Sequence, residues 1–198
     1  MRALIIVDLQ NDFVEGGALA VPEGETLVPL INKLQPDYDL VVATQDWHPA
    51  DHGSLVTNHP GHQPGDVIDL NGLPQILWPA HCVQGTAGAD FVPGLDQDRW
   101  AAVFRKGTDP GIDSYSGFFD NGRRKATGLG DYLKDRGVTE VHVLGLATDY
   151  CVKFTALDAA SLGFKTALIR KASRGVNLQP GDVDRAIEEM RAAAVEIL

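Results

Sequence analysis

The hydrophobic positions of this chain fall into short continuous runs, separated by longer polar and amphipathic stretches. Continuous apolar runs are typical of parallel strands that are buried on both faces of a sheet. This pattern predicts strands at residues 4–7, 40–43, 102–104, 141–144 and 165–169. The first run stops at Asp8, so it is too short for the apolar region of a signal peptide, and we interpret it as the first strand.

Helical spacing of apolar residues predicts four helices among these strands. They cover residues 26–35, 125–136, 152–160 and about 182–193. Pro36 and Gly137 end the first two helices, and Asp182 is an N-cap for the last. Because strands alternate with helices, we expect an α/β fold with a mostly parallel sheet.

Residues 45–98 depart from this alternation. The stretch is crowded with Pro, Gly, His and Asp, and it shows little helical or strand periodicity. A loop-rich stretch of this length inside a compact domain is usually functional. We find no linker composition, internal repeat or low-complexity run, so we expect one domain over residues 1–198 that contains this loop-rich insertion.

Composition narrows the classes of function. The chain has 198 residues and a formal net charge of −10, which argues against non-specific binding to nucleic acid or to anionic membranes. No apolar run approaches the ~18 residues that a membrane span needs. Two cysteines make no disulfide framework, so we expect a reducing, cytoplasmic setting. The sequence leaves open whether the chain forms a homo-oligomer.

Polar side chains stand at the ends of four predicted strands. They are Asp8, the segment 44–46, Lys106 and the turn that leads to Cys151. Ligands of open α/β sheets bind outside the carboxyl ends of the strands. We therefore expect these side chains to meet at one edge of the sheet and to form a site there.

Cys151 is the candidate nucleophile of this site. It lies between a predicted strand and a predicted helix, where free backbone amides and the helix dipole favour a thiolate. A nucleophilic thiol also needs a base. A histidine could fill that role, and so could Asp8 with Lys106 holding it in place; the spacing of the residues does not choose between these sets.

A second group of residues suggests a metal. Asp46 and His48 are two residues apart in a segment that follows a strand, so an extended backbone would point both side chains the same way. Carboxylate and imidazole ligands suit zinc, iron or manganese. A third ligand would have to come from elsewhere, and the candidates are His52, His59, His62 and His81.

Three aromatic residues fall in predicted loops, where a role in the core is less automatic. Phe13, Trp78 and Tyr115 could form the walls of a pocket for a small planar ligand.

Six stretches of the chain resemble the nicotinamidase family, within the isochorismatase-like hydrolases. The segments Asp46-Trp-His-Pro and Trp78-Pro-Ala-His-Cys are the most specific to that family. The six stretches cover residues 7–13, 44–49, 78–84, 104–107, 113–121 and 145–152.

The resemblance implies a flavodoxin-like, three-layer α/β/α fold. It implies a hydrolase that deamidates nicotinamide, and also pyrazinamide, to the acid and ammonia through a cysteine thioester, a step of NAD salvage. The catalytic triad of the family falls on Asp8, Lys106 and Cys151.

The resemblance also implies one divalent metal ion, with zinc expected before iron or manganese. The metal ligands of the family fall on Asp46, His48 and His81. Some members add a ligand from the following loop, where His52 and Ser54 are candidates, but the spacing differs and we leave both out of the core set.

Two further features follow from the resemblance. The backbone amides of Ala147 and Cys151 would form the oxyanion hole, and the peptide bond between Leu146 and Ala147 would be cis. The aromatic residues Phe13, Trp78 and Tyr115 would pack around the nicotinamide ring. Cys82, which follows a proposed ligand, is expected to have a packing role.

Other functions stay open at this stage. Another amidase of the same superfamily, acting on a carbamoyl or ureido compound, would keep the triad but need no metal. Isochorismate hydrolysis is disfavoured, since members with that activity generally lack the cysteine. A protein that binds a metal or ligand without catalysis is the alternative from a different class.

Overall fold

The computed structural model describes all residues from 1 to 198. Its main sheet contains β1 (Arg2–Val7), β2 (Leu40–Asp46), β5 (Trp100–Lys106), β6 (Glu140–Leu146), β7 (Lys165–Arg174) and β8 (Glu196–Ile197). The six strands are all parallel and lie in the order β5-β2-β1-β6-β7-β8. The prediction of an α/β fold with a mostly parallel sheet is confirmed.

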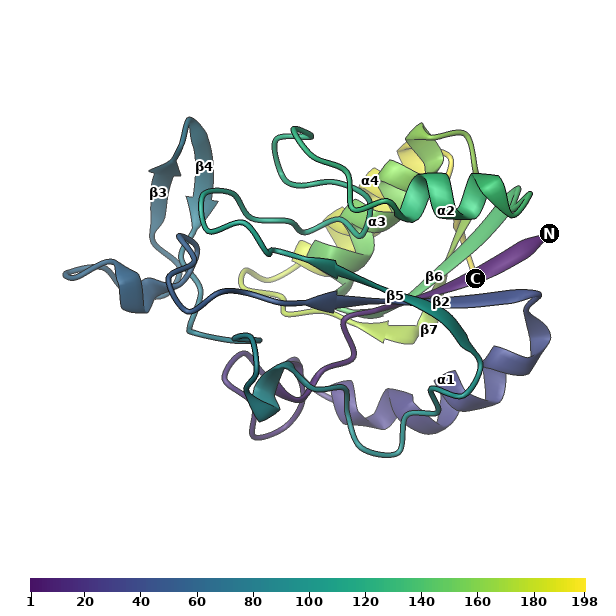
Figure 1. Ribbon diagram of the computed structural model, residues 1–198, viewed down its shortest axis with the longest axis horizontal. Coiled ribbons are helices and arrows are strands. Elements are labelled where there is room, and N and C mark those ends of the chain that lie inside the picture. The colour runs from purple at the N-terminus through teal and green to yellow at the C-terminus, as the bar shows by residue number, and fades with distance from the viewer.

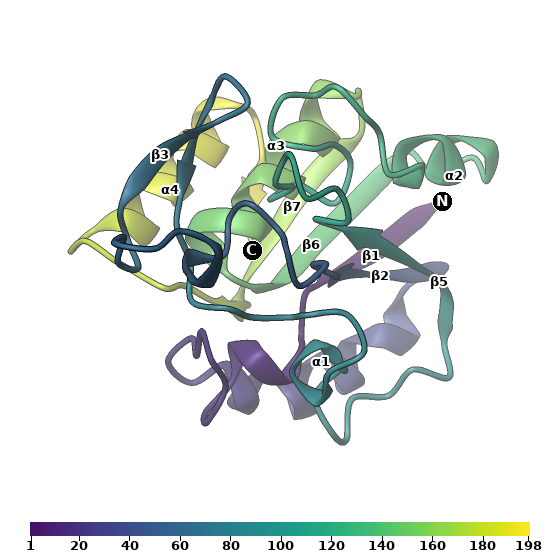
Figure 2. The same cartoon turned by 60° about the vertical axis from the view of Figure 1, so that its left-hand side comes forward.

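Helices cover both faces of this sheet and make three layers (Figures 1 and 2). The helix α1 (Val28–Leu34) packs on one face, while α2 (Leu129–Asp135), α3 (Lys153–Ser161) and α4 (Asp182–Ala192) pack on the other. In β1, Leu4 and Ile6 face the α1 side, whereas Ile5 and Val7 face the other helices. Burial of each such side chain stabilises the fold by about 1.5–3 kcal/mol, which explains the continuous apolar run.

Short helical turns complete the backbone. They are η1 (Asn11–Phe13), η2 (Gly24–Leu27), η3 (Gln35–Asp37), η4 (Val56–Asn58), η5 (Ala87–Ala89) and the π-helical turn η6 (Thr148–Val152). None of the helices has the length and apolar character that a membrane span requires.

Several elements differ from the sequence-based prediction. β7 runs on to Arg174 instead of ending at 169, β8 is not among the predicted strands, and the N-cap of α4 is Gly181 rather than Asp182. β5 is longer than the predicted 102–104. It is an edge strand, and its side chains alternate between exposed and half-buried, so much of it lacks the continuous apolar run on which the prediction rests. The helix expected at 125–136 begins only at Leu129. Ahead of it, Phe119 and Ala126 form an isolated bridge, and Gly128 has a φ of +94°.

The insertion at 45–98 contains a hairpin that the sequence did not predict. Its strands are β3 (Val67–Leu70) and β4 (Leu73–Ile76), which are antiparallel. They are too short, and β3 too exposed, to give a clear periodic signal. The hairpin stands on the side toward which the arrows of β2 and β5 point (Figure 1), so the insertion covers the carboxyl ends of the strands.

Candidate active site

Cys151 lies at a junction between a strand and a helix, as predicted. β6 ends at Leu146, the peptide bond from Leu146 to Ala147 is cis, and the π-helical turn η6 carries Cys151 into α3. A side chain on Gly145 would collide with the backbone of Val7, so glycine is needed where β6 passes β1. The junction therefore seats Cys151 next to the end of β1.

Lys106 joins the strand ends into one cluster. Its Nζ lies 2.8 Å from Asp8 Oδ2, 2.8 Å from Asp46 Oδ1 and 3.4 Å from Cys151 Sγ. It also donates to the backbone oxygen of Ser114 at 3.1 Å. Four strands thus deliver these side chains to one point, as the sequence predicted. Lys106 contacts both the thiol and Asp8, and no histidine forms a hydrogen bond with the thiol, so the geometry favours the Cys-Asp-Lys set over a Cys-His pair.

Burial dominates the electrostatics of this cluster. It raises the pKa of the Cys151 thiol well above its usual value, although the ammonium of Lys106 opposes the shift. Burial also raises the pKa of Asp8, again against Lys106. For Lys106 burial lowers the pKa, but the carboxylates of Asp46 and Asp8 outweigh it and the pKa is raised. The raised pKa of the thiol agrees with the expectation that Cys151 needs a base to become a thiolate.

Asp8 is placed to be that base. Thr44 Oγ1 donates to Asp8 Oδ1 at 2.6 Å, and Lys106 contacts Oδ2. Both contacts fix the orientation of the carboxylate. Lys106 Nζ contacts both this carboxylate, at 2.8 Å, and the thiol of Cys151, at 3.4 Å, so it bridges the two groups.

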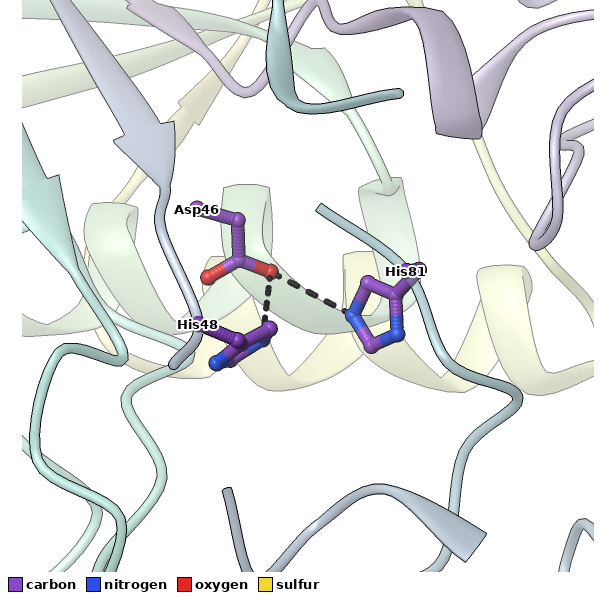
Figure 3. Close-up of side chains that lie close together, drawn as sticks. All are labelled: Asp46, His48 and His81. Atoms are coloured by element: carbon purple, nitrogen blue, oxygen red, sulfur yellow. Dashed lines mark ion pairs between the residues drawn. The ribbon is translucent and has the colours of Figure 1, made fainter. Parts of the chain in front are cut away.

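Asp46, which contacts Lys106 in the first cluster, also forms a second cluster with two histidines (Figure 3). Asp46 Oδ2 lies 3.3 Å from His48 Nε2 and 3.5 Å from His81 Nε2. The other ring nitrogens lie 2.9 Å from the carbonyl of Gly107 and 2.8 Å from that of Pro79. Because a carbonyl only accepts, each Nδ1 carries a proton, and in the neutral ring Nε2 then has a lone pair to offer a metal.

This arrangement fits a divalent metal ion. His48 Nε2 is buried and has no hydrogen-bond partner, and one ligand atom from each of Asp46, His48 and His81 lies within 4.8 Å of the others. Burial raises the pKa of Asp46, but Lys106 and His48 lower it well below its usual value, so the carboxylate is charged. Burial lowers the pKa of His48, and Asp46 raises it to about 9, a sign of how strongly this carboxylate attracts a cation at that nitrogen.

His52 is buried beside the cluster, with its ring 4.3 Å from that of His48. The backbone N–H of Ser54 donates to His52 Nδ1 at 3.1 Å, so the neutral ring carries its proton on Nε2. Burial lowers the pKa of His52 and keeps the ring neutral. His52 Nε2, like His48 Nε2, is buried without a hydrogen-bond partner, so a ligand role for His52 stays a prediction. Asp113 lies close to both His48 and His52, and no pattern in the sequence singled it out.

Three other candidates lie outside these clusters. His59 bonds through Nε2 to the carbonyl of Gly53, and His62 pairs with Asp66 at the surface. Cys82 is buried, and burial raises the pKa of its thiol well above its usual value. Packing is therefore the role that its surroundings support.

A small cavity of about 30 Å³ joins the two clusters. All three aromatic candidates line it, and Tyr115 accepts a hydrogen bond from Trp78 Nε1 at 3.1 Å. The sequence did not single out Tyr150 and Val176 as lining residues, although Tyr150 stands next to Cys151. The lining comprises Phe13, Leu19, Asp46, Trp78, His81, Asp113, Tyr115, Ala147, Tyr150, Cys151 and Val176.

Comparison with known families agrees with this geometry. The model of the isochorismatase domain matches residues 2–198. The chain belongs to the isochorismatase family. A family relative, the nicotinamidase of Escherichia coli (strain K12), is 54% identical over 99% of this chain and 93% of its own length.

Solved structures of the isochorismatase family share the fold. The nicotinamidase and pyrazinamidase of Acinetobacter baumanii superposes with a TM-score of 0.96 at 46% identity, covering 100% of this chain and 95% of that one. The yeast nicotinamidase bound to the inhibitor nicotinaldehyde gives 0.94 at 33%, covering 100% and 99%. The pyrazinamidase of Pyrococcus horikoshii in complex with zinc gives 0.80 at 40%, covering 100% and 98%.

Proposed function

We propose that this chain is a metal-dependent nicotinamidase, which hydrolyses nicotinamide to nicotinate and ammonia and accepts pyrazinamide as a second substrate. The observation that carries this proposal is one small cavity lined by Cys151, by Asp46 and His81 and by aromatic rings. The relatives named above support it, since they are nicotinamidases and pyrazinamidases.

The first half of the reaction forms a thioester. Asp8 accepts the proton of the Cys151 thiol, and the thiolate attacks the carboxamide carbon to form a C–S bond. The backbone amides of Ala147 and Cys151 donate to the oxyanion that develops. A donor of this kind is typically worth about 3 kcal/mol in the barrier. The C–N bond then breaks, and Asp8 returns the proton to the leaving ammonia.

The second half regenerates the enzyme. A water molecule gives a proton to Asp8 and attacks the carbonyl carbon of the thioester. The C–S bond breaks, nicotinate leaves and the thiol recovers its proton. Throughout, Lys106 keeps its charge, orients Asp8 and offsets the negative charge that passes between carboxylate and sulfur.

Asp46, His48 and His81 would hold the metal. Zinc suits one carboxylate and two imidazoles, a set that leaves a position open for a further ligand, and iron and manganese suit the same atoms. The bound ion would supply a Lewis acid beside the cavity, which would orient the pyridine ring of the substrate. Phe13, Trp78 and Tyr115 pack around the ring.

Release of ammonia from nicotinamide, with the metal content measured on the same sample, tests the proposal. We expect turnover together with about one bound metal ion per chain. A metal-loaded protein that releases no ammonia from nicotinamide would refute the proposal. Faster release from a carbamoyl or ureido compound would point instead to the metal-independent amidases, against which the Asp46, His48 and His81 set speaks.

A further inference from the structure

Asp149 is a buried carboxylate that the proposed reaction does not use. It lies in the turn η6, two residues before Cys151, and only 5% of its surface is exposed. Its two oxygens accept hydrogen bonds from two successive backbone amides. Oδ1 accepts the N–H of Val176 at 2.9 Å, and Oδ2 accepts the N–H of Asn177 at 2.7 Å.

These amides belong to the segment that follows β7 and leads to α4. Val176 in that segment lines the same cavity as Cys151. Asp149 therefore ties the turn that carries the proposed nucleophile to another wall of the pocket. The packing around these hydrogen bonds is tight at Gly175. A Cβ there would lie 3.0 Å from Asp149 Oδ1 and would collide with the side chain of Val183.

The size of the cavity makes the position of this wall important. Its volume is about 30 Å³, so a planar ring that enters it must contact the side chains that line it. The side chains that close it therefore decide which rings can enter and how tightly they are held. The position of the Val176 side chain depends on its backbone, and Asp149 holds that backbone through the N–H of Val176.

We propose that Asp149 is a positioning residue that sets ring specificity by holding Val176 against the substrate. This inference rests on the proposed function, because it requires a planar carboxamide in the cavity. The chemistry of the side chain suits the task. A carboxylate offers an acceptor to each of two N–H groups, whereas an amide offers one acceptor and turns an N–H₂ group toward the other donor.

Asp149→Asn should therefore loosen the wall while keeping the shape of the side chain. We expect the KM for nicotinamide to rise about tenfold, with kcat within about threefold of the wild type. The preference for nicotinamide over the bulkier quinoline-3-carboxamide, as a ratio of kcat/KM values, should fall by a similar factor. Asp182→Asn is the matched control, because Asp182 also accepts an N–H of this segment, that of Gln179 at 2.7 Å, but lies outside the cavity. It should change neither quantity.

Two further variants separate specificity from simple support of the fold. Val176→Ala should show the same loss of preference, and combining it with Asp149→Asn should add little, since both act on one wall. Gly175→Ala places a methyl group against Asp149 Oδ1 and should reproduce the rise in KM. This variant tests the inference if Asp149→Asn does not fold. The rate of alkylation of Cys151, followed by peptide mass mapping, should not fall below that of the wild type in any of these variants.

The outcomes are distinct. An unchanged KM and an unchanged preference in both Asp149→Asn and Gly175→Ala would overturn the inference and leave the proposed function intact. A fall in kcat and in Cys151 alkylation, with KM unchanged, would also overturn it, because Asp149 would then only support the nucleophile turn. A wild-type protein that releases no ammonia from nicotinamide would refute the proposed function, and this inference with it.

Discussion

Two clusters of polar side chains lie at opposite ends of the same sheet, and they differ in whether their hydrogen bonds are complete. At the amino end, His142 Nδ1 lies 2.8 Å from the hydroxyl of Tyr38, and His142 Nε2 lies 3.0 Å from Glu140 Oε1. Both ring nitrogens have partners. At the carboxyl end, His48 Nε2 and His52 Nε2 are both buried without one.

The difference separates a structural histidine from a functional one. A buried polar atom without a partner costs about 1–3 kcal/mol, so an arrangement that keeps one has a use for it. At the carboxyl end that use is the proposed metal. The amino-end cluster (Tyr38, Glu140, His142 and Lys165) has no such gap and should contribute only to stability.

The largest expected effect is at the carboxyl end. Cys151→Ala should lower nicotinamide turnover by about 10⁴-fold or more, because the thioester cannot form. Binding of nicotinamide, measured by calorimetry, should persist, because the metal ligands and the aromatic walls remain. Cys82→Ala is the control, since it removes the other buried thiol and should keep most of the turnover. Substantial activity in Cys151→Ala would rule out the nucleophile assignment.

The next effect concerns the metal. Asp46→Ala should weaken metal binding by more than about 100-fold, because it removes a ligand that faces both histidines. Metal content after dialysis, measured by mass spectrometry, reports this directly. Glu140→Ala removes the carboxylate beside His142 instead and should leave the metal content unchanged. Wild-type metal occupancy in Asp46→Ala would show that the ligand set is wrong.

Chelation offers the same comparison without mutation. Removal of the metal should abolish turnover, and addition of zinc should restore it. Chelation should shift the unfolding midpoint of Glu140→Ala, a variant at the amino end, by the same amount as that of the wild type. Full activity of a metal-free sample, with metal absence checked on the same protein, would contradict the proposed metal dependence.

The two ends of the sheet should also differ in how much a lysine contributes to the free energy of unfolding. Lys106 is fully buried between two carboxylates, so Lys106→Met leaves both without their partner and should lower the free energy of unfolding by about 3–5 kcal/mol. The side chain of Lys165 is 67% exposed and 3.4 Å from Glu140, so Lys165→Met should cost no more than about 0.5 kcal/mol. Urea titration of both variants checks the difference, and equal losses would contradict it.

What could be predicted from the sequence follows the same division. Central strands are buried on both faces, so their apolar runs are continuous and their ends are readable. Asp8, Asp46, Lys106 and Cys151 could be grouped in advance because parallel register brings strand ends together. The edge strand β5 and the hairpin of β3 and β4 were underestimated or missed, because half-exposed strands carry a weaker pattern.

The walls of the pocket could be predicted only in part. Phe13, Trp78 and Tyr115 drew attention as aromatic residues in loops, but Val176 reaches the cavity through a loop whose path depends on Asp149. Such a contact between distant segments leaves no local pattern. The extent to which burial raises the pKa of the Cys151 thiol could not be predicted either, because the cost of burial depends on the packing of the whole site.

The smallest expected effect completes the comparison at the amino end. Tyr38→Phe removes the hydroxyl that pairs with His142 Nδ1 but keeps the ring, over which the guanidinium of Arg2 lies at 5.1 Å. The free energy of unfolding should fall by about 1 kcal/mol, because one buried hydrogen bond is lost and its partner is left without one. Urea denaturation measures this loss, and kcat/KM for nicotinamide should be unchanged. A drop in kcat/KM would show that the completed cluster is coupled to the site, and that complete hydrogen bonding does not by itself mark a histidine as structural.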